Sequence, residues 1–221
     1  AMHRLERERW QSVVNDVWPN LPLAALDGKT PLEAVGDDEL KISLAAAINT
    51  LEAICDERDY FFDPQPLRER LKVPEPLPLT IGEQSVLSTL PVPKLLRLPI
   101  AELTNDQLVH VMRRTVITPV SALSYTVFTE MVRRADIVEE EDVAAIYSAL
   151  VGLCRGKFDR EEALRWIAQG RDFDRQRNAP LEKVVTWDLR EATVRLWEPD
   201  DPEGPRLLKR LWDETSVKLP H

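Results

Sequence analysis

The sequence is poor in the residues that cross-link chains, coordinate metals or form tight turns. Its 221 residues include 2 cysteines, 3 histidines and 7 glycines. So few glycines favour helices over a turn-rich sheet. Cys55 and Cys154 each lie within an apolar helical pattern, so we expect two reduced core thiols in a cytoplasmic protein. His3, His110 and His221 are too far apart to suggest a zinc site, and we predict no metal.

Long apolar runs and an excess of positive charge are also absent. No run approaches the length of about 18 residues that a membrane-spanning helix needs, and the N-terminus is charged rather than signal-like. The net charge of −9 disfavours nucleic acid or an anionic membrane surface as the main partner. The 43% hydrophobic and 30% charged residues are typical of an ordinary soluble protein.

Common catalytic motifs are missing as well. The sequence contains no H-E-x-x-H, G-x-S-x-G or G-x-G-x-x-G pattern. The lone His110, near Arg113 and Arg114, is interpreted as a partly buried polar residue rather than a catalyst. We therefore predict no catalytic residue, no cofactor and no cofactor-binding residue. An enzyme whose site is assembled from dispersed Arg, Asp and Glu residues remains an alternative, because sequence spacing does not reveal such a site.

Proline is abundant, and it divides the chain. Eight of the 17 prolines lie between Pro64 and Pro99, which excludes one long helix there and predicts an extended connector over residues 61–99. The connector is rich in leucine, so we expect it to lie over helices, with a short helix near Leu67–Leu71. An N-terminal helical module (1–60) precedes it, and a helical-hairpin domain (100–221) follows it.

Apolar residues recur at helical spacing on both sides of the connector. Before it, the pattern predicts helices at 3–17 and 38–57, the second opened by Asp37 and Asp38. After it, a capping box at Thr104 opens the first of several further helices, expected near 104–116, 119–135, 143–156, 159–174, 180–198 and 207–212. The helix after Pro180 carries an apolar series at Leu181, Val185, Leu189, Ala192 and Leu196. No segment alternates like a strand, so the predicted fold is all-α.

The four carboxylates at Glu139–Asp142 suit the start of a helix, where negative charge is favoured. The helix pair that follows, residues 143–174, has the length of one tetratricopeptide unit and resembles that repeat. The matching positions are Tyr147, Leu150, Ala163, Ile167 and Gly170. Cys154 and Arg175 depart from the pattern, and no second copy lies 34 residues away. We interpret the segment as one degenerate tetratricopeptide-like hairpin in a stack of helix pairs; a generic helical hairpin is an equal alternative.

The same hairpin carries the candidate partner surface. It consists of Arg165, Trp166, Arg171, Phe173, Arg175 and Arg177. Arginine and tryptophan are enriched at interaction hot spots, and a peptide or partner helix would dock here if the hairpins form a concave face. The alternative is that the tryptophans fill gaps between helices.

The segment Gly28-Lys29-Thr30 looks at first like the end of a phosphate-binding P-loop. The P-loop pattern requires glycine at position 23, where the sequence has leucine, and a strand leading into the loop. Pro19 and Pro22 interrupt the approach, because proline lacks the amide that a sheet needs. We therefore interpret the segment as a structural turn.

Thr30, Pro31 and Glu33 form the pattern of a capping box, with Gly36 ending a very short helical turn. We expect Gly28 to adopt a positive φ angle. The buried face of the turn, formed by Trp18, Leu26 and Pro31, is predicted to pack against the helix that carries Leu44 and Ile48.

The tract from Trp18 to Ala34 reads W…LP…ALDGKTPLEA. It resembles a segment of uncharacterised bacterial proteins that carry SEC-C or tetratricopeptide-like modules. It is also similar to the toxin-binding segment of Xre/MbcA/ParS antitoxins. The resemblance covers about residues 18–55 and implies a bacterial origin and a small helical module around a buried turn. The antitoxins' N-terminal helix-turn-helix region and the Cys- and His-rich SEC-C zinc module are not visible here.

These observations favour a non-catalytic, helical protein-protein interaction module that binds another protein or peptide. The alternatives are an enzyme with a dispersed site and an antitoxin-like regulator that holds a toxin through residues 18–55.

Overall fold

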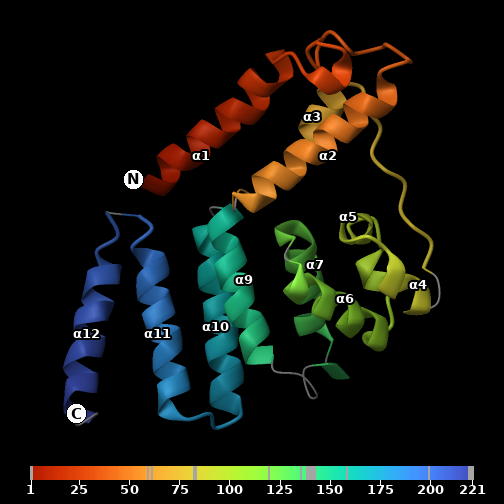
Figure 1. Ribbon diagram of the computed structural model, residues 1–221. Helices are drawn as coiled ribbons and strands as arrows, with labels where there is room; N and C mark the ends of the chain where they lie inside the picture. Colours follow the sequence, from red (N-terminus) through yellow and green to blue (C-terminus); the bar gives the residue numbers. More distant parts are fainter. Residues whose placement is uncertain are drawn as a thin grey trace. The chain divides into compact units, whose positions relative to one another are not determined.

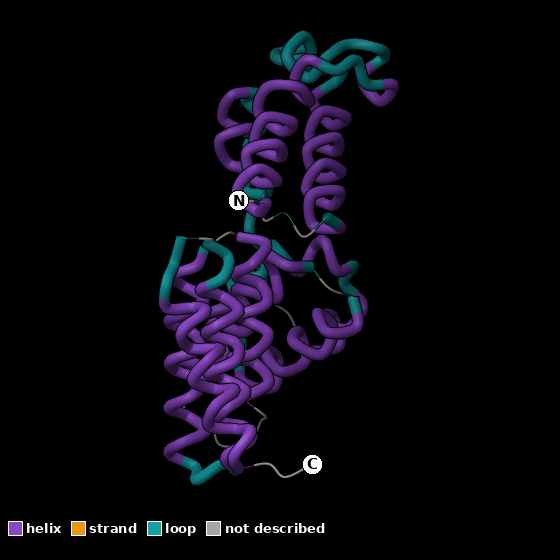
Figure 2. Tube along the Cα trace, turned by 90° about the vertical axis from the view of Figure 1, so that its left-hand side faces the viewer, coloured by secondary structure: helices purple, strands orange, loops and turns teal. Residues whose placement is uncertain are grey.

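A computed structural model describes residues 2–218 apart from 59, 61, 82, 83, 119, 135, 138–142, 158 and 199. Throughout these residues the regular secondary structure is helical and no strand is present (Figures 1 and 2). The predicted all-α class is confirmed. The predicted helix start at Glu139–Asp142 lies outside the described residues.

The α-helices, with the labels of Figure 1, are α1 (Met2–Ser12), α2 (Lys41–Glu57), α3 (Gln65–Arg70), α4 (Gln84–Thr89), α5 (Val92–Leu95), α6 (Asn105–Ile117), α7 (Ser121–Arg133), α9 (Val143–Lys157), α10 (Arg160–Gln176), α11 (Leu181–Arg195) and α12 (Glu203–Lys218). A π-helical turn extends α1 over Val13–Val17, and short 3₁₀ turns lie at Trp18–Asn20, Ala24–Leu26 and Ile100–Glu102.

The chain divides into two compact units, one from Met2 to Ser124 and one from Tyr125 onward. The division falls inside α7, whereas we expected boundaries at residues 60 and 99. The difference arises because the proline-rich segment contributes to the first unit. Leu67, Leu71 and Val73 complete the core around α2, and α4 and α5 pack against α6.

The core of the N-terminal module forms around α2. Leu44 and Ile48 of this helix are buried in one cluster with Trp18 and Leu26, as the sequence predicted, and Pro31 is also buried. The predicted start of the helix at residue 38 is wrong, since α2 begins at Lys41. Asp37 and Asp38 instead lie in the preceding turn, where the Asp37 carboxylate accepts a hydrogen bond from the Glu39 amide at 3.1 Å.

The turn before α2 has the predicted capping box. The Thr30 amide donates to the Glu33 carboxylate at 2.8 Å, and the Glu33 amide donates to the Thr30 hydroxyl at 3.2 Å. Gly28 and Gly36 have φ angles of +80° and +85°. A 3₁₀ turn precedes Asp27, and turns rather than a helix follow Thr30, so this segment has neither the strand nor the helix of a P-loop.

The proline-rich segment is less extended than predicted. The longest described stretch without helix or turn is 73–81, and α3, α4 and α5 occupy much of the rest. The Arg114 guanidinium of α6 donates to the carbonyls of Leu87 and Leu90 at 2.5 and 2.6 Å. The last carbonyls of a short helix lack intrahelical partners, so Arg114 satisfies them and holds α4 against α6. Arg97 donates to the Leu77 carbonyl at 2.8 Å.

The expected capping signals are present at two later helices. Thr104 and Gln107 form the capping box of α6. Asp159 caps α10 by accepting from the Glu162 amide at 2.9 Å. Gly156 does not end α9, which continues to Lys157. The chain reverses after that residue, where the Asp159 amide donates to the Cys154 carbonyl at 3.1 Å.

The second unit is built from consecutive helices that pack side by side: α9 against α10, α10 against α11 and α11 against α12 (Figure 1). Of the positions that matched the tetratricopeptide pattern, Tyr147 and Leu150 of α9 are buried, as are Ala163, Ile167 and Gly170 of α10. The predicted face of α11 is only partly correct. Ala192 is buried, but Leu181, Leu189 and Leu196 are exposed.

Candidate functional site

The contact between α10 and α11 is built around Gly170. A Cβ atom at this position would lie 2.5 Å from Cη2 of Trp187, so only glycine leaves room for the indole ring. The Trp187 indole N–H donates to the buried Asp174 carboxylate at 2.7 Å. The expected small residue of α10 therefore receives a tryptophan of α11.

Charged side chains extend this contact along the two helices. The Arg171 guanidinium lies 3.0 Å from the Asp188 carboxylate and 2.5 Å from that of Glu191. Glu191 also pairs with Arg195 at 2.8 Å. A further pair joins Arg160 at the start of α10 to Asp201, before α12. These ion pairs link neighbouring helices and neutralise the charged side chains that face each other across the contacts.

The residues of the predicted partner surface lie in different environments in the structure. Arg171 is engaged in the ion pairs with α11, and Trp166 is only 8% exposed. Arg165, Arg175 and Arg177 are exposed. The structure does not bring the six residues onto one open face.

The aromatic members of that surface pack inside the hairpin. The Tyr147 ring of α9 lies 6.2 Å from the Trp166 ring and 5.9 Å from the Phe173 ring, measured between centroids. The Arg177 guanidinium lies over Phe173 at 3.9 Å. Trp166 and Trp187 thus fill gaps between helices, which is the alternative interpretation of the tryptophans.

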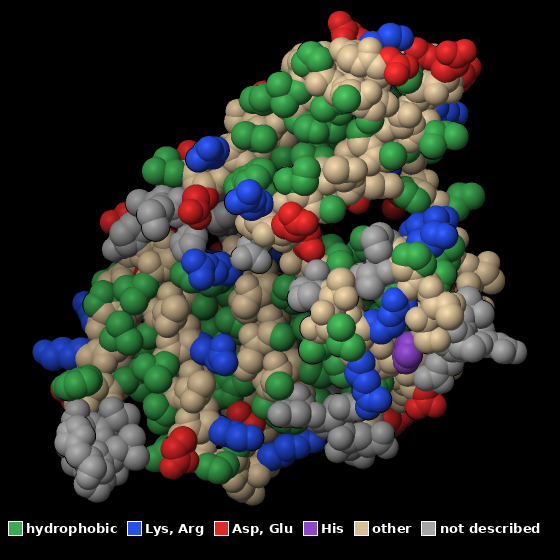
Figure 3. All heavy atoms as spheres, in the orientation of Figure 1, with side chains coloured by type: hydrophobic (Ala, Val, Ile, Leu, Met, Phe, Trp, Pro, Cys, Tyr) green, Lys and Arg blue, Asp and Glu red, His purple; other side chains and the backbone are tan. Residues whose placement is uncertain are grey.

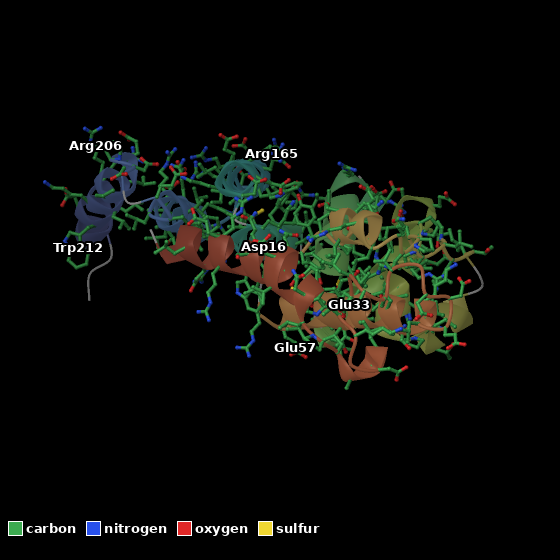
Figure 4. All side chains as sticks on the ribbon, turned by 90° about the horizontal axis from the view of Figure 1, so that it is seen from above. Asp16, Glu33, Glu57, Arg165, Arg206 and Trp212 are labelled. Atoms are coloured by element: carbon green, nitrogen blue, oxygen red, sulfur yellow. The ribbon has the colours of Figure 1, made fainter. Side chains whose placement is uncertain are left out.

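The exposed apolar surface of this unit lies instead on its last two helices. Between α11 and α12 is a groove of about 390 Å³, here called the α11–α12 groove, lined by Val185, Leu189, Leu208, Lys209, Leu211 and Trp212. Leu189 is 46% exposed and Trp212 is 73% exposed. Hydrophobic side chains gather over both helices in Figure 3. In Figure 4, Trp212 points away from α12 on the side opposite Arg206 and Arg165.

The sequence analysis placed Val185 and Leu189 in the apolar series of the helix after Pro180, but it did not identify the groove. The signal that could have identified it is the width of the apolar arc on α12. Leu207 and Leu211 lie one turn apart and are buried, whereas Leu208 and Trp212, the next residue in each case, are exposed. Two adjacent apolar stripes on one helix need two neighbours, and α12 packs extensively only against α11 among the described helices.

The titratable groups between α7, α9 and α10 are arranged for stability rather than reactivity. Lys157 Nζ lies 2.7 Å from the Glu162 carboxylate and 3.7 Å from the centre of the Tyr125 ring. Burial opposes both charges, but their hydrogen bond outweighs it, raising the pKa of Lys157 and lowering that of Glu162. Burial also raises the pKa of Cys154 to about 12, so this thiol is protonated and unreactive at neutral pH.

No group of three or more Cys, His, Asp or Glu side chains within the described ranges is arranged to hold a metal ion. His110 is half-buried in α6. Among the helices that the structure describes, none is both long and apolar enough to cross a membrane.

No family model matches the chain, and neither a curated protein nor a solved structure matches it significantly.

Proposed function

We propose that this protein is a non-catalytic helical module that binds another protein or peptide, and that the α11–α12 groove is its binding surface. The observation that carries the proposal is the exposure of Leu189, Leu208 and Trp212 along one groove. Large apolar side chains grouped on a surface mark interaction sites, whereas single ones are common on any protein. Tryptophan is also the residue most often found at the energetic centre of interfaces.

The chemistry of the neighbouring residues supports binding rather than catalysis. The charged side chains between α10 and α11 are paired with each other, and Cys154 is held as a neutral thiol. The groove itself is lined mainly by hydrocarbon and indole groups, with Lys209 as its charged member. Such a lining suits the apolar face of a partner helix.

The proposal also covers the type of the α9–α10 helix pair and the location of the protein. The α9–α10 pair is proposed to be a tetratricopeptide-like hairpin, supported by the small residues Ala163 and Gly170 on the buried side of α10. A reducing, cytoplasmic location is proposed from the free, buried state of Cys55 and Cys154. The resemblance of residues 18–55 to bacterial helical modules is kept as a proposal about origin.

The proposal is tested by affinity capture with the tagged full chain, followed by quantitative mass spectrometry. Proteins bound through the groove, including an untagged copy of the chain, are retained by the wild type and lost with Trp212→Asp. They are kept with Ile42→Asp, which places the same charge at an 84% exposed side chain on α2. A stoichiometric small molecule or metal in the purified protein, with no groove-dependent protein, would contradict the binding-module function.

A further inference from the structure

We propose that α12 is a detachable helix and that the Asp201 carboxylate, two residues before it, is the latch that holds it on α11. Asp201 contacts α10, α11 and α12 through a small set of polar groups, here called the Asp201 latch. The latch acts within the second unit and needs no partner, so it goes beyond the proposed function. Only its consequence for the α11–α12 groove, of which α12 is one wall, rests on that function.

The joint between α11 and α12 has a small buried core. Ala192 of α11 is buried with Leu207 and Leu211 of α12, and Val185 packs partly against them. The joint between α10 and α11 has in addition a buried hydrogen bond from an indole to a carboxylate, and a close contact between that indole and a glycine. Local opening needs least free energy where few apolar side chains are buried. Among the last three helices, α12 is therefore expected to separate first.

The Asp201 latch fastens the beginning of α12 to both of the preceding helices. Oδ1 accepts a hydrogen bond from the Glu203 amide at 2.8 Å and so caps α12. Oδ2 pairs with the Arg160 guanidinium, in the first turn of α10, and lies 3.5 Å from Nη1 of Arg195, in the last turn of α11. Only 8% of the Asp201 side chain is exposed, so solvent screens these pairs less than it screens surface ion pairs.

The position of the latch lets it control the whole of α12. In Figure 1, the turn between α11 and α12 lies at the same end of the second unit as the start of α10, so one carboxylate reaches both. A detached helix of this length is only marginally stable in water, so α12 loses its own hydrogen bonds when it separates. The α11–α12 groove then loses one wall. The latch therefore controls whether that binding surface exists.

Amide hydrogen exchange of the full chain, resolved by mass spectrometry, tests the latch. Asp201→Asn removes the charge but keeps an oxygen that caps α12, because asparagine caps helices about as well as aspartate does. Exchange in residues 207–213 is expected to be about tenfold faster than in the wild type, while α9 and α10 keep their protection. Asp200→Asn, the same change at the exposed residue beside it, is the control and is expected to leave α12 unchanged.

Arg160→Gln tests the latch from the other helix. A cation in the first turn of a helix opposes the helix dipole, so its removal does not weaken α10 itself. Faster exchange in residues 207–213, without faster exchange in α10, is therefore expected from loss of the pair with Asp201. The double variant with Asp201→Asn is expected to exchange no faster than Asp201→Asn alone, because both changes remove the same pair. Arg165→Gln, at an exposed residue of the same helix, is the control.

The outcomes separate the latch from the proposed function. Unchanged exchange in α12 in both variants overturns the latch, as does a double variant in which the two effects add. Equal acceleration across α9, α10 and α12 overturns the detachable helix, because the ion pairs would then stabilise the second unit as a whole. A chain whose α12 behaves as expected, but which captures no protein through the groove, overturns the proposed function and leaves the latch standing.

Discussion

At Gly170 the backbone of α10 approaches a side chain of α11 so closely that no Cβ fits. The Trp187 ring occupies the position where Cβ would be, and the Asp174 carboxylate holds the ring by its N–H. Neither the ring nor the helix can retreat without losing that buried hydrogen bond. The spacing of the two helices is therefore determined by one glycine and one tryptophan.

Gly170→Ala is expected to destabilise the protein by about 1–3 kcal/mol, because the added methyl group overpacks this contact. Gly152→Ala provides the matched control, since Gly152 also lies within a helix but has no atom within 4 Å of the added Cβ. The control is expected to stabilise the protein by about 0.5–1 kcal/mol through helix propensity. Urea unfolding measures both. Equal effects of the two substitutions would show that helix propensity alone governs position 170.

At Gly28 the constraint is the backbone conformation rather than a lack of space for a side chain. No atom lies within 4 Å of the position of its Cβ, but its φ angle is +80°. Gly28→Val is expected to cost about 1–2 kcal/mol or more from backbone strain alone. Lys29→Ala removes only an exposed ion pair with Asp37, which solvent screens, so it is expected to cost much less stability than Gly28→Val. A larger loss for Lys29→Ala in thermal unfolding would contradict this assignment of strain to Gly28.

Among the helices, the short ones of the proline-rich segment depend on a neighbour. The α4 helix has only six residues, too few to be stable alone, and Arg114 of α6 binds the carbonyl of Leu87 within it and that of Leu90 just after it. This element is expected to open separately from the rest of its unit.

Arg114→Gln is expected to speed amide hydrogen exchange in residues 87–98 by about tenfold or more, since two charge-assisted hydrogen bonds are lost. The core around Leu44 and Ile48 should keep its protection. Arg113→Gln, a substitution of the exposed neighbour on the same helix, serves as the control. An equal increase in exchange across the whole first unit would show that α4 does not open on its own.

The helices themselves were predictable because their signals are local. Thr104, Asp159 and the Thr30–Glu33 pair act within four residues, and the structure places each as expected. The face of α11 was not predictable, because Trp187 and Glu191, which lie outside its apolar series, make the contact with α10. Hydrophobic periodicity detects Leu181 and Leu189, but it does not detect that Arg171 and Asp174 of another helix bind this helix through Glu191 and Trp187.

The same limit applies to the candidate site. The arginines and tryptophans of α10 were identified by residue type, but burial and ion pairing depend on which helix lies alongside. The groove depends on which of two apolar stripes α11 covers. A single helical pattern contains no information on that choice.

At the scale of the molecule, acid is expected to weaken the second unit. Burial opposes the charge of Glu191, but hydrogen bonds from Arg171 and Arg195 outweigh it and lower the pKa of Glu191 below its ordinary value of 4.5. A carboxylate with a lowered folded-state pKa stabilises the fold above its unfolded-state pKa. That contribution is lost as the pH falls through the folded-state pKa, from about pH 5 downward.

Urea unfolding at about pH 7, 5 and 3.5, followed by circular dichroism, measures this dependence. Glu191→Gln is expected to be less stable than the wild type at pH 7 and to show a shallower decline toward low pH. Parallel declines in the two proteins would indicate that Glu191 does not carry the acid sensitivity.

Each compact unit contains one of the two cysteines, Cys55 in the first and Cys154 in the second. Burial raises the pKa of Cys55 to about 11 and that of Cys154 to about 12. Alkylating reagents attack the thiolate, so each cysteine becomes modifiable when its own surroundings open. Each unit therefore contains one cysteine whose rate of alkylation reports local opening of that unit. The two modification rates, resolved by peptide mass, follow the opening of the two halves separately in a single sample without any engineered label.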